Sequence, residues 1–280
     1  VLDTRPLTGV TSYAPSELVV TVRAGTALAE LEAALAEKGQ YLPFEPPHYG
    51  QGGAVATVGG MVAAGLNGPA RASVGAVRDY VLGAQLLNGR AELLTFGGQV
   101  MKNVAGYDVS RLLAGSLGTL GLLVEVSLKV LPKAVAEATL VFELDEASAL
   151  KQLNAWGGQP LPVNASCWHA GALAIRLRGA RAAIEAAQKT MGGQRMAPDQ
   201  AEQLWTGLRE QTAPFFGLAE GESLLRLSVP DTTVPLNLGP TLIEWGGAQR
   251  WLRLPLHAVP DLAGVPGHAT LFRAADKGAG

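Results

Sequence analysis

Cysteine is almost absent from this chain, since Cys167 is the only one in 280 residues. A disulfide within the chain is therefore impossible, and a cysteine-ligated cluster or zinc site is nearly excluded. Charged residues make up only 16%, the formal net charge is -2, and no run of Lys and Arg occurs. This balance gives no electrostatic case for a nucleic-acid partner. The lack of cysteine pairs fits a reducing, cytoplasmic compartment.

One uncharged stretch, residues 46–70, has the length of a membrane-spanning helix, roughly 20 residues. It contains seven glycines, three prolines and Asn67. These residues would leave a lipid-exposed helix weak and polar, whereas they suit a loop wrapped on a ligand. The chain also opens without a charged segment followed by an apolar one, so neither a signal peptide nor a transmembrane segment is predicted.

The first regular elements form a strand followed by a helix. Residues 18–23 (LVVTVR) are a β-branched run that predicts a buried strand. A helix is expected next, with Thr26 as its N-cap and Gly39 in the left-handed conformation just past its end. The apolar stripe of this helix consists of Leu28, Leu31 and Leu35.

Further strands are predicted after the glycine-rich stretch. Residues 80–87 and 91–96 read as two strands joined across Asn88-Gly89, a dipeptide typical of hairpin turns. Residues 104–113 predict a helix, and residues 121–130 (GLLVEVSLKV) predict a strand whose second half alternates between apolar and polar.

The pattern of apolar and polar residues in the sequence changes at Pro132. Strand-like pieces beyond it alternate with helical ones, which indicates a second domain with an antiparallel sheet. The strands are expected at residues 138–142, 172–177, 223–229 and 249–254, and the helices at 146–156, 180–191 and 199–211. We therefore predict an α+β chain with domains at residues 1–133 and 134–280, the second being the smaller.

Glycine is concentrated in the first domain, where 16 of the 35 glycines fall between Gly50 and Gly121. Glycine weakens regular structure, so this density is typical of backbone at positive φ or in close contact with another group. A loop-rich β domain with tight turns is one interpretation. The order ATVGGMVAAG (residues 56–65) favours another, because exposed N–H groups at a helix start can bind a pyrophosphate.

Several motifs are missing, which narrows the type of site. No GxGxxG follows the first strand, no Gly-Lys pair exists, and no HExxH occurs, so nicotinamide Rossmann, Walker A and zincin sites are disfavoured. The sequence AGSLG (residues 114–118) is one residue short of a hydrolase nucleophile elbow, and a strand follows it instead of a helix. A dinucleotide other than a nicotinamide, namely FAD, is therefore favoured.

Two long blocks, residues 51–83 and 96–133, closely resemble the FAD-binding domain of the vanillyl-alcohol oxidase and p-cresol methylhydroxylase (PCMH-type) superfamily. Shorter blocks resemble the FAD-binding subunits of bacterial glycolate oxidases. These are PPHYG (46–50), MKNVAGYD (101–108), WTGLREQTAPFF (205–216), LIEWGGAQRWLR (242–253) and GHATLFR (267–273). Together they run over nearly the whole chain.

The resemblance implies a set of FAD contacts. Some would lie along the pyrophosphate, others near the ribityl chain or the flavin side. They are Pro47, Thr57, Gly59, Gly60, Ala63, Gly75, Gly121, Leu122 and Leu123. Gly59 and Gly121 could instead be turn residues, and Leu122 and Leu123 plain core. Lys102 and Asp108 are expected to brace their loop and not to act in catalysis.

The sequence departs from the superfamily pattern at both ends. The first pyrophosphate loop of the superfamily would precede Val1, and a C-terminal DPxGxxNPG-like segment would follow Gly280. We therefore expect this chain to carry an N-terminally truncated FAD domain and one side of the FAD site.

A catalytic residue is not evident. Oxidation of a 2-hydroxy acid needs a base, a group that holds the carboxylate, and a flavin. Related enzymes hold a metal with two closely spaced histidines, whereas His48, His169, His257 and His268 are far apart, so no metal site is predicted. His268 is the best single candidate, although a lone histidine is more often structural.

The resemblance implies a hetero-oligomeric complex. A larger homologous FAD-containing subunit would oxidise glycolate to glyoxylate, an iron-sulfur subunit would accept the electrons, and this chain would assist. The location would be cytoplasmic, or peripheral at the inner membrane through the complex. A rival hypothesis is a scaffold that keeps the flavin fold only to assemble its partners, because all five tryptophans lie in the second domain and could serve a core or an interface.

Overall fold

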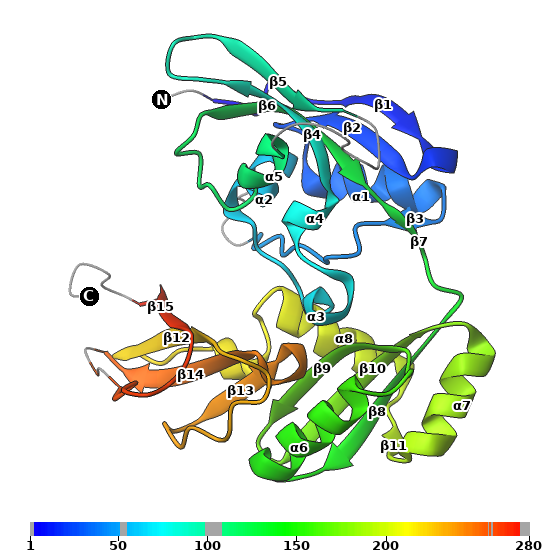
Figure 1. Cartoon of the computed structure of the whole chain (residues 1–280), viewed down its shortest axis with the longest axis vertical. Coiled ribbons are helices and arrows are strands. Elements are labelled where there is room, and N and C mark those ends of the chain that lie inside the picture. The colour runs from blue at the N-terminus through cyan, green and yellow to red at the C-terminus, as the bar shows by residue number, and fades with distance from the viewer. Residues whose placement is uncertain (1–2, 51–54, 99–107, 257, 259, 275–280) are drawn as a thin grey trace. The chain divides into compact units, whose positions relative to one another are not determined.

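The computed structural model describes residues 3–50, 55–98, 108–256, 258 and 260–274. The chain divides into two compact units, one made of Val1–Gly68 and Val74–Lys133, the other of Pro69–Ser73 and Ala134–Gly280. Figure 1 shows a sheet with its own helices in each unit. The second unit is the larger, although the sequence predicts it as the smaller, and the short segment Pro69–Ser73 belongs to it.

The first unit is built on an antiparallel sheet of order β1-β2-β6-β4-β5, with β3 and β7 paired separately. Its strands are β1 (Val10–Ala14), β2 (Val19–Arg23), β3 (Gln40–Tyr41), β4 (Val81–Leu87), β5 (Leu93–Gly97), β6 (Leu122–Lys129) and β7 (Leu131–Pro132). Its helical segments are η1 (Pro15–Glu17), α1 (Leu28–Glu37), α2 (Val58–Ala64), α4 (Val77–Tyr80) and α5 (Val109–Leu112). A further turn, α3 (Arg71–Val74), begins in the segment assigned to the second unit.

The predicted apolar stripe of α1 is confirmed, because Leu28, Leu31 and Leu35 are all fully buried. Gly39 is left-handed, at φ +67°, as predicted. The prediction of Thr26 as N-cap is wrong, since Ala27 takes that position without a side-chain hydrogen bond. The Thr26 hydroxyl instead accepts a hydrogen bond from the backbone N–H of Gly9 at 2.9 Å. A tertiary partner thus competes for the oxygen that would cap the helix.

The hairpin between β4 and β5 is confirmed, but its loop is longer than the two-residue turn that Asn88-Gly89 favours. The Asn88 side-chain oxygen accepts from the N–H groups of Arg90 at 2.9 Å and Glu92 at 3.0 Å. These bonds stabilise a longer loop, because one carboxamide replaces the acceptors of a tight turn. Of the predicted helix at 104–113, only α5 lies among the described residues from 108 onward.

The second unit has an antiparallel sheet of order β11-β8-β10-β9-β13-β14-β12-β15, which confirms the predicted architecture. The strands are β8 (Ala136–Glu143), β9 (Val163–His169), β10 (Ala172–Gly179), β11 (Gln194–Arg195), β12 (Glu222–Ser228), β13 (Thr241–Glu244), β14 (Gln249–Pro255) and β15 (His268–Arg273). The helical segments are α6 (Glu146–Gly157), α7 (Arg181–Met191), α8 (Pro198–Arg209), η3 (Pro214–Phe216) and η4 (Trp245–Gly247).

Helices of the second unit cover both faces of its sheet. On β10, Leu173 and Ile175 pack in one core with residues of α6 and α7, whereas Ala174 packs in another with Trp205 of α8. Alternate residues of a strand point to opposite faces, so the two cores lie on the two sides of the sheet. This sandwiching buries the apolar residues of both faces.

Candidate cofactor site

The residues predicted to contact the pyrophosphate surround the start of α2. Thr57 caps the helix, because its hydroxyl accepts a hydrogen bond from the Gly60 N–H at 3.1 Å. The N–H of Val58 donates to the Thr26 carbonyl at 2.9 Å, and the N–H of Gly59 donates to the Ala24 carbonyl at 2.7 Å. The sequence predicts exposed N–H groups here, yet these donors already have protein acceptors. The exposed backbone of Gly60 remains accessible to a ligand.

Gly59 has a structural role in addition to any ligand contact. A Cβ at this position would lie 2.7 Å from the Cβ of Ala24, at the end of β2. Only glycine therefore lets α2 pack this closely on the first sheet. At the other end of α2, the N–H groups of Gly115 and Leu117 bond to the carbonyls of Val62 at 3.0 Å and Ala63 at 2.9 Å. The loop before β6 thus satisfies the last carbonyls of the helix.

A cavity of about 250 Å³ adjoins α2 within the first unit. Three of the predicted FAD contacts line it together, namely Pro47, Thr57 and Gly60. The other lining residues are His48, Tyr49, Val55, Ala56, Met61, Ala64 and Leu66. Small side chains along α2 keep this space open. The cavity is below the ~300 to 1,000 Å³ typical of ligand pockets, so it suits part of a dinucleotide.

The remaining predicted contacts lie elsewhere in the first unit. Ala63 packs against the core from α2. Gly75 has φ +95°, and a Cβ there would lie 2.8 Å from a carboxylate oxygen of Asp79, which accepts from the Ala76 N–H. Gly121 precedes β6, where a Cβ would lie 2.7 Å from the Leu87 carbonyl. Leu122 is half-buried and Leu123 is buried in the core. Their contacts with FAD stay predictions.

His48 lines the cavity and was not singled out from the sequence as a site residue. Its Nε2 lies 3.0 Å from a carboxylate oxygen of Glu32, on α1. The segment that carries it has left-handed residues on either side, Glu45 at φ +48° and Tyr49 at φ +47°. Such conformations are uncommon for residues other than glycine and concentrate at binding sites. The Pro-Pro-His-Tyr-Gly sequence indicates an unusual backbone conformation in this segment. The pairing of His48 with Glu32 has no sequence signal, because the two residues meet only in the fold.

The other histidines lie in the second unit or outside the described residues. His268 is exposed on the edge strand β15 of the second unit, opposite Ser228. His169 has its Nδ1 3.0 Å from the Thr241 carbonyl, and His257 lies outside the described residues. Among the residues that the structure describes, no group of three or more His, Cys, Asp or Glu side chains could hold a metal. The role of His268 stays a prediction.

The residues expected to brace their loop are only partly visible. Asp108 pairs with Arg111 at 2.8 Å, within the first turn of α5, while Lys102 lies outside the described residues. The tryptophans of the second unit serve mainly its cores, since Trp156, Trp168, Trp205 and Trp251 are buried.

A buried acid, Glu244, lies at the end of β13 in the second unit. Burial raises the pKa of Glu244 to about 7, although hydrogen bonds from Trp251 Nε1 at 2.7 Å and Gln249 Nε2 at 3.0 Å favour the charged form. Burial, and secondarily the charge of Glu244, raises the pKa of the Cys167 thiol well above its ordinary value. Cys167 is therefore an inert core residue.

Comparison with known proteins supports the flavin fold. A model of the FAD binding domain family matches residues 1–97. Glycolate oxidase subunit GlcE of Escherichia coli (strain K12) is 47% identical over 283 residues, covering 99% of this chain and 78% of that protein. This chain belongs to the GlcE family. It is thus an FAD-linked oxidoreductase subunit, and the fold class and resemblance predicted from the sequence are confirmed.

More distant relatives match about half of the chain. Glycolate oxidase subunit GlcD of Bacillus subtilis (strain 168) is 32% identical over 135 residues, which is 48% of this chain and 28% of that protein. D-lactate dehydrogenase of Archaeoglobus fulgidus is 33% identical over 133 residues, 48% of this chain and 29% of that protein. A solved structure, an alkyldihydroxyacetonephosphate synthase, shares the fold with a TM-score of 0.61 at 16% identity, over 81% of this chain and 49% of that one. Among the described helices, none is both long and apolar enough to cross a membrane.

Proposed function

We propose that the first unit binds FAD at the cavity beside α2, and that the chain acts as the FAD-binding subunit of a complex that oxidises glycolate to glyoxylate. The observation that carries the proposal is the convergence of Pro47, Thr57 and Gly60 on one cavity. The name of the relative in Escherichia coli supports the choice of glycolate, a 2-hydroxy acid, as substrate.

The residues present fit part of the cofactor. Gly60 is exposed beside the cavity, and a Cβ there would lie 3.1 Å from the Thr57 hydroxyl. A side chain at this position would therefore extend from the helix start into the space that a phosphate or ribityl group needs. Thr57 and Gly60 would hold the pyrophosphate side, and Pro47 would pack on the ribityl chain.

Bound FAD would accept the hydride that leaves the carbinol carbon of a 2-hydroxy acid. The described residues that line the cavity include no Lys, Arg, Asp or Glu, and the Nε2 of the histidine among them, His48, already lies 3.0 Å from a carboxylate oxygen of Glu32. This chain's own residues would therefore bind and shield. We therefore assign substrate oxidation to a larger homologous subunit of the GlcD type and electron acceptance to an iron-sulfur subunit. The proposal includes a cytoplasmic location, peripheral at the inner membrane through the complex.

A flavin spectrum of the chain purified together with its partner subunits tests the proposal. Because the larger subunit also carries FAD, we expect a flavin content above one per larger subunit, with absorption bands that glycolate bleaches. Gly60→Val should reduce the flavin content of this subunit, while Gly89→Val should not, because a Cβ at Gly89 meets open space. Equal flavin content in the two variants would contradict the assignment of the cavity.

A scaffold role is the second candidate function. Two observations favour it: the backbone N–H groups of Val58 and Gly59 at the start of α2 already bond to protein carbonyls, and the cavity is small. Under this alternative the chain assembles its partners through the flavin fold without flavin. An assembled complex whose flavin content equals that of the larger homologous subunit alone, with no flavin in this chain, would select it over the flavin-binding function.

A further inference from the structure

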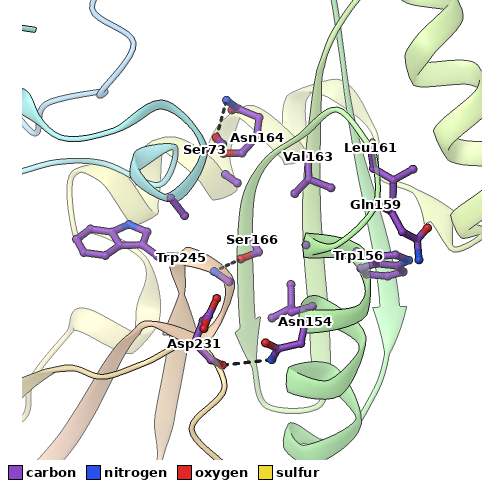
Figure 2. Close-up of a pocket in the computed structure, with 15 residues that line it drawn as sticks. Ser73, Asn154, Trp156, Gln159, Leu161, Val163, Asn164, Ser166, Asp231 and Trp245 are labelled. Carbon is purple, nitrogen blue, oxygen red and sulfur yellow. Dashed lines mark hydrogen bonds between the residues drawn. The ribbon is translucent and has the colours of Figure 1, made fainter. Parts of the chain in front are cut away.

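A second cavity, about 390 Å³ in volume, lies within the second unit (Figure 2). Residues from β9, α6, η4 and the segment Pro69–Ser73 line it. Its volume is within the ~300 to 1,000 Å³ of ligand pockets and suits a molecule the size of a monosaccharide. Figure 2 shows Ser73 and Asn164 at one end and Asn154 and Asp231 at the other, with Ser166 between them.

The amide of Asn164 has a fixed orientation. Arg176 Nε donates to its side-chain oxygen at 2.7 Å, and a guanidinium can only donate. The Asn164 Nδ2 is therefore the end near the Ser73 hydroxyl, at 3.5 Å. The Arg176 side chain is fixed in turn. It is buried, and its guanidinium lies over the Trp205 ring at 5.0 Å from the ring centre. The Asn164 Nδ2 is thus a hydrogen-bond donor at this end of the cavity. Its 3.5 Å contact with Ser73 is long, so it can donate a shorter hydrogen bond to a ligand.

The opposite end presents acceptors. Asn154 Nδ2 donates to the backbone carbonyls of Leu150 at 2.8 Å and Asp231 at 3.2 Å. Both of its N–H groups are thus used, so its side-chain oxygen is the end left for a ligand. The exposed carboxylate of Asp231 lies beside it.

Ser166 lies between the two ends and is buried at 3% exposure. Its hydroxyl oxygen accepts from the Gly246 N–H at 2.9 Å, so the hydroxyl proton can be donated to a ligand. The turn that delivers this N–H has Trp245 and Gly246 in the left-handed region, at φ +54° and +69°. A bulky residue holds that conformation only where its surroundings fix it. Here Arg71 lies over the Trp245 ring at 4.7 Å.

The charge of the lining disfavours anions. The described lining residues include one carboxylate, Asp231, and no Lys, Arg or His. A 2-hydroxy acid would meet one negative charge and no cationic lining residue, so this lining does not suit glycolate. Hydroxyl groups fit better, because each one both donates and accepts and could bridge the donor and acceptor ends.

We propose that this cavity binds an uncharged polyhydroxylated ligand, a sugar or polyol. Asn164 and Ser166 donate to its hydroxyl oxygens, and Asn154 and Asp231 accept from its hydroxyl hydrogens. The apolar side chains of Leu153, Leu161 and Val163 contact its carbon framework. The proposal does not depend on flavin binding by the first unit.

Saturation-transfer NMR on the full chain tests it with D-glucose, D-ribose and myo-inositol, up to ~20 mM to cover the weak affinity of so small a ligand. D-gluconate is the charged match of glucose. We expect transfer to at least one neutral probe and none to gluconate. Ser166→Ala should weaken binding by about tenfold, the loss of one hydrogen bond.

Ala72→Trp is the second variant, because Ala72 is exposed and lines the cavity, so the indole fills the space without disturbing a core. Ala182→Trp, on the exposed side of α7, is its control. Near-ultraviolet circular dichroism checks the fold of each variant. The proposal is overturned if none of the neutral probes binds, if gluconate binds as well as glucose, or if Ala72→Trp binds like Ala182→Trp.

Discussion

Replacing Glu244 by glutamine is expected to stabilise the second unit above neutral pH and to leave it unchanged in acid. The burial of this carboxyl raises its pKa from 4.5 to about 7. Between these values the folded protein holds a proton that the unfolded chain has released. The free energy of unfolding therefore falls as the pH rises through this window, and it stays low above it.

The size of the effect follows from the pKa difference. One pKa unit corresponds to 1.36 kcal/mol, so the shift from 4.5 to about 7 amounts to about 3 kcal/mol. Glutamine is uncharged at every pH, and its side-chain oxygen can accept from Trp251 and Gln249 as the carboxylate does. Glu244→Gln should match the parent near pH 4.5 and exceed its unfolding free energy by about 3 kcal/mol at pH 8.

Tryptophan fluorescence during urea unfolding is a suitable assay, because all five tryptophans lie in the second unit. Their emission reports this unit even if the first one unfolds separately. The difference between variant and parent, measured from pH 5 to 8.5, cancels the titration of groups common to both. Glu202→Gln, on the exposed side of α8, is the control and should show no pH-dependent difference. A difference for Glu244→Gln that does not grow with pH would refute the reasoning.

Three further outcomes are expected. Gly59→Ala should destabilise the first unit by about 1–3 kcal/mol in circular-dichroism melts, because the new Cβ would lie 2.7 Å from the Cβ of Ala24. A similar loss of stability in the control Gly89→Ala, whose Cβ meets open space, would contradict this reason. Arg250→Met should cost roughly 3 kcal/mol or more in the urea assay, since the buried guanidinium bonds three carbonyls, those of Thr233, Val234 and Gly247. His268→Ala should leave glycolate oxidation by the reconstituted complex intact because the residue is exposed at a sheet edge, whereas complete loss with FAD still bound would show a catalytic role.

Elements with a local signature were predictable. The spacing of Leu28, Leu31 and Leu35 fixes which face of α1 is buried, because helix periodicity is set by the backbone itself. Asn88 identified the β4–β5 hairpin through side-chain bonds within five residues. Strands β12 and β14 were found in the same way, from their apolar runs.

Elements that depend on distant partners were missed. Strand β9 contains Asn164 and Ser166, which look unlike strand residues until Arg176 and Gly246 satisfy them. The N-cap of α1 is Ala27 and not Thr26, because the Thr26 hydroxyl accepts a hydrogen bond from the N–H of Gly9, seventeen residues earlier. Such hydrogen bonds leave no periodic signal.

The candidate cofactor site was likewise predictable from the sequence only in part. Glycine density and the ATVGG order identified the start of α2, and the resemblance gave FAD. Only the fold shows that Pro47, Thr57 and Gly60 share a cavity while Gly75 and Gly121 do not line it. The pairing of His48 with Glu32 likewise required α1 and the following loop to meet.

The sequence by itself determined the local elements, because helix period, β-branched runs and backbone freedom at glycine act over a few residues, and its resemblance to known flavoproteins gave the family and the fold class. Tertiary structure decided the rest. Burial set the pKa of Glu244, and long-range packing assigned Pro69–Ser73 to the second unit and formed its cavity. These properties arise from desolvation and contact between residues far apart in the chain, which local patterns cannot encode.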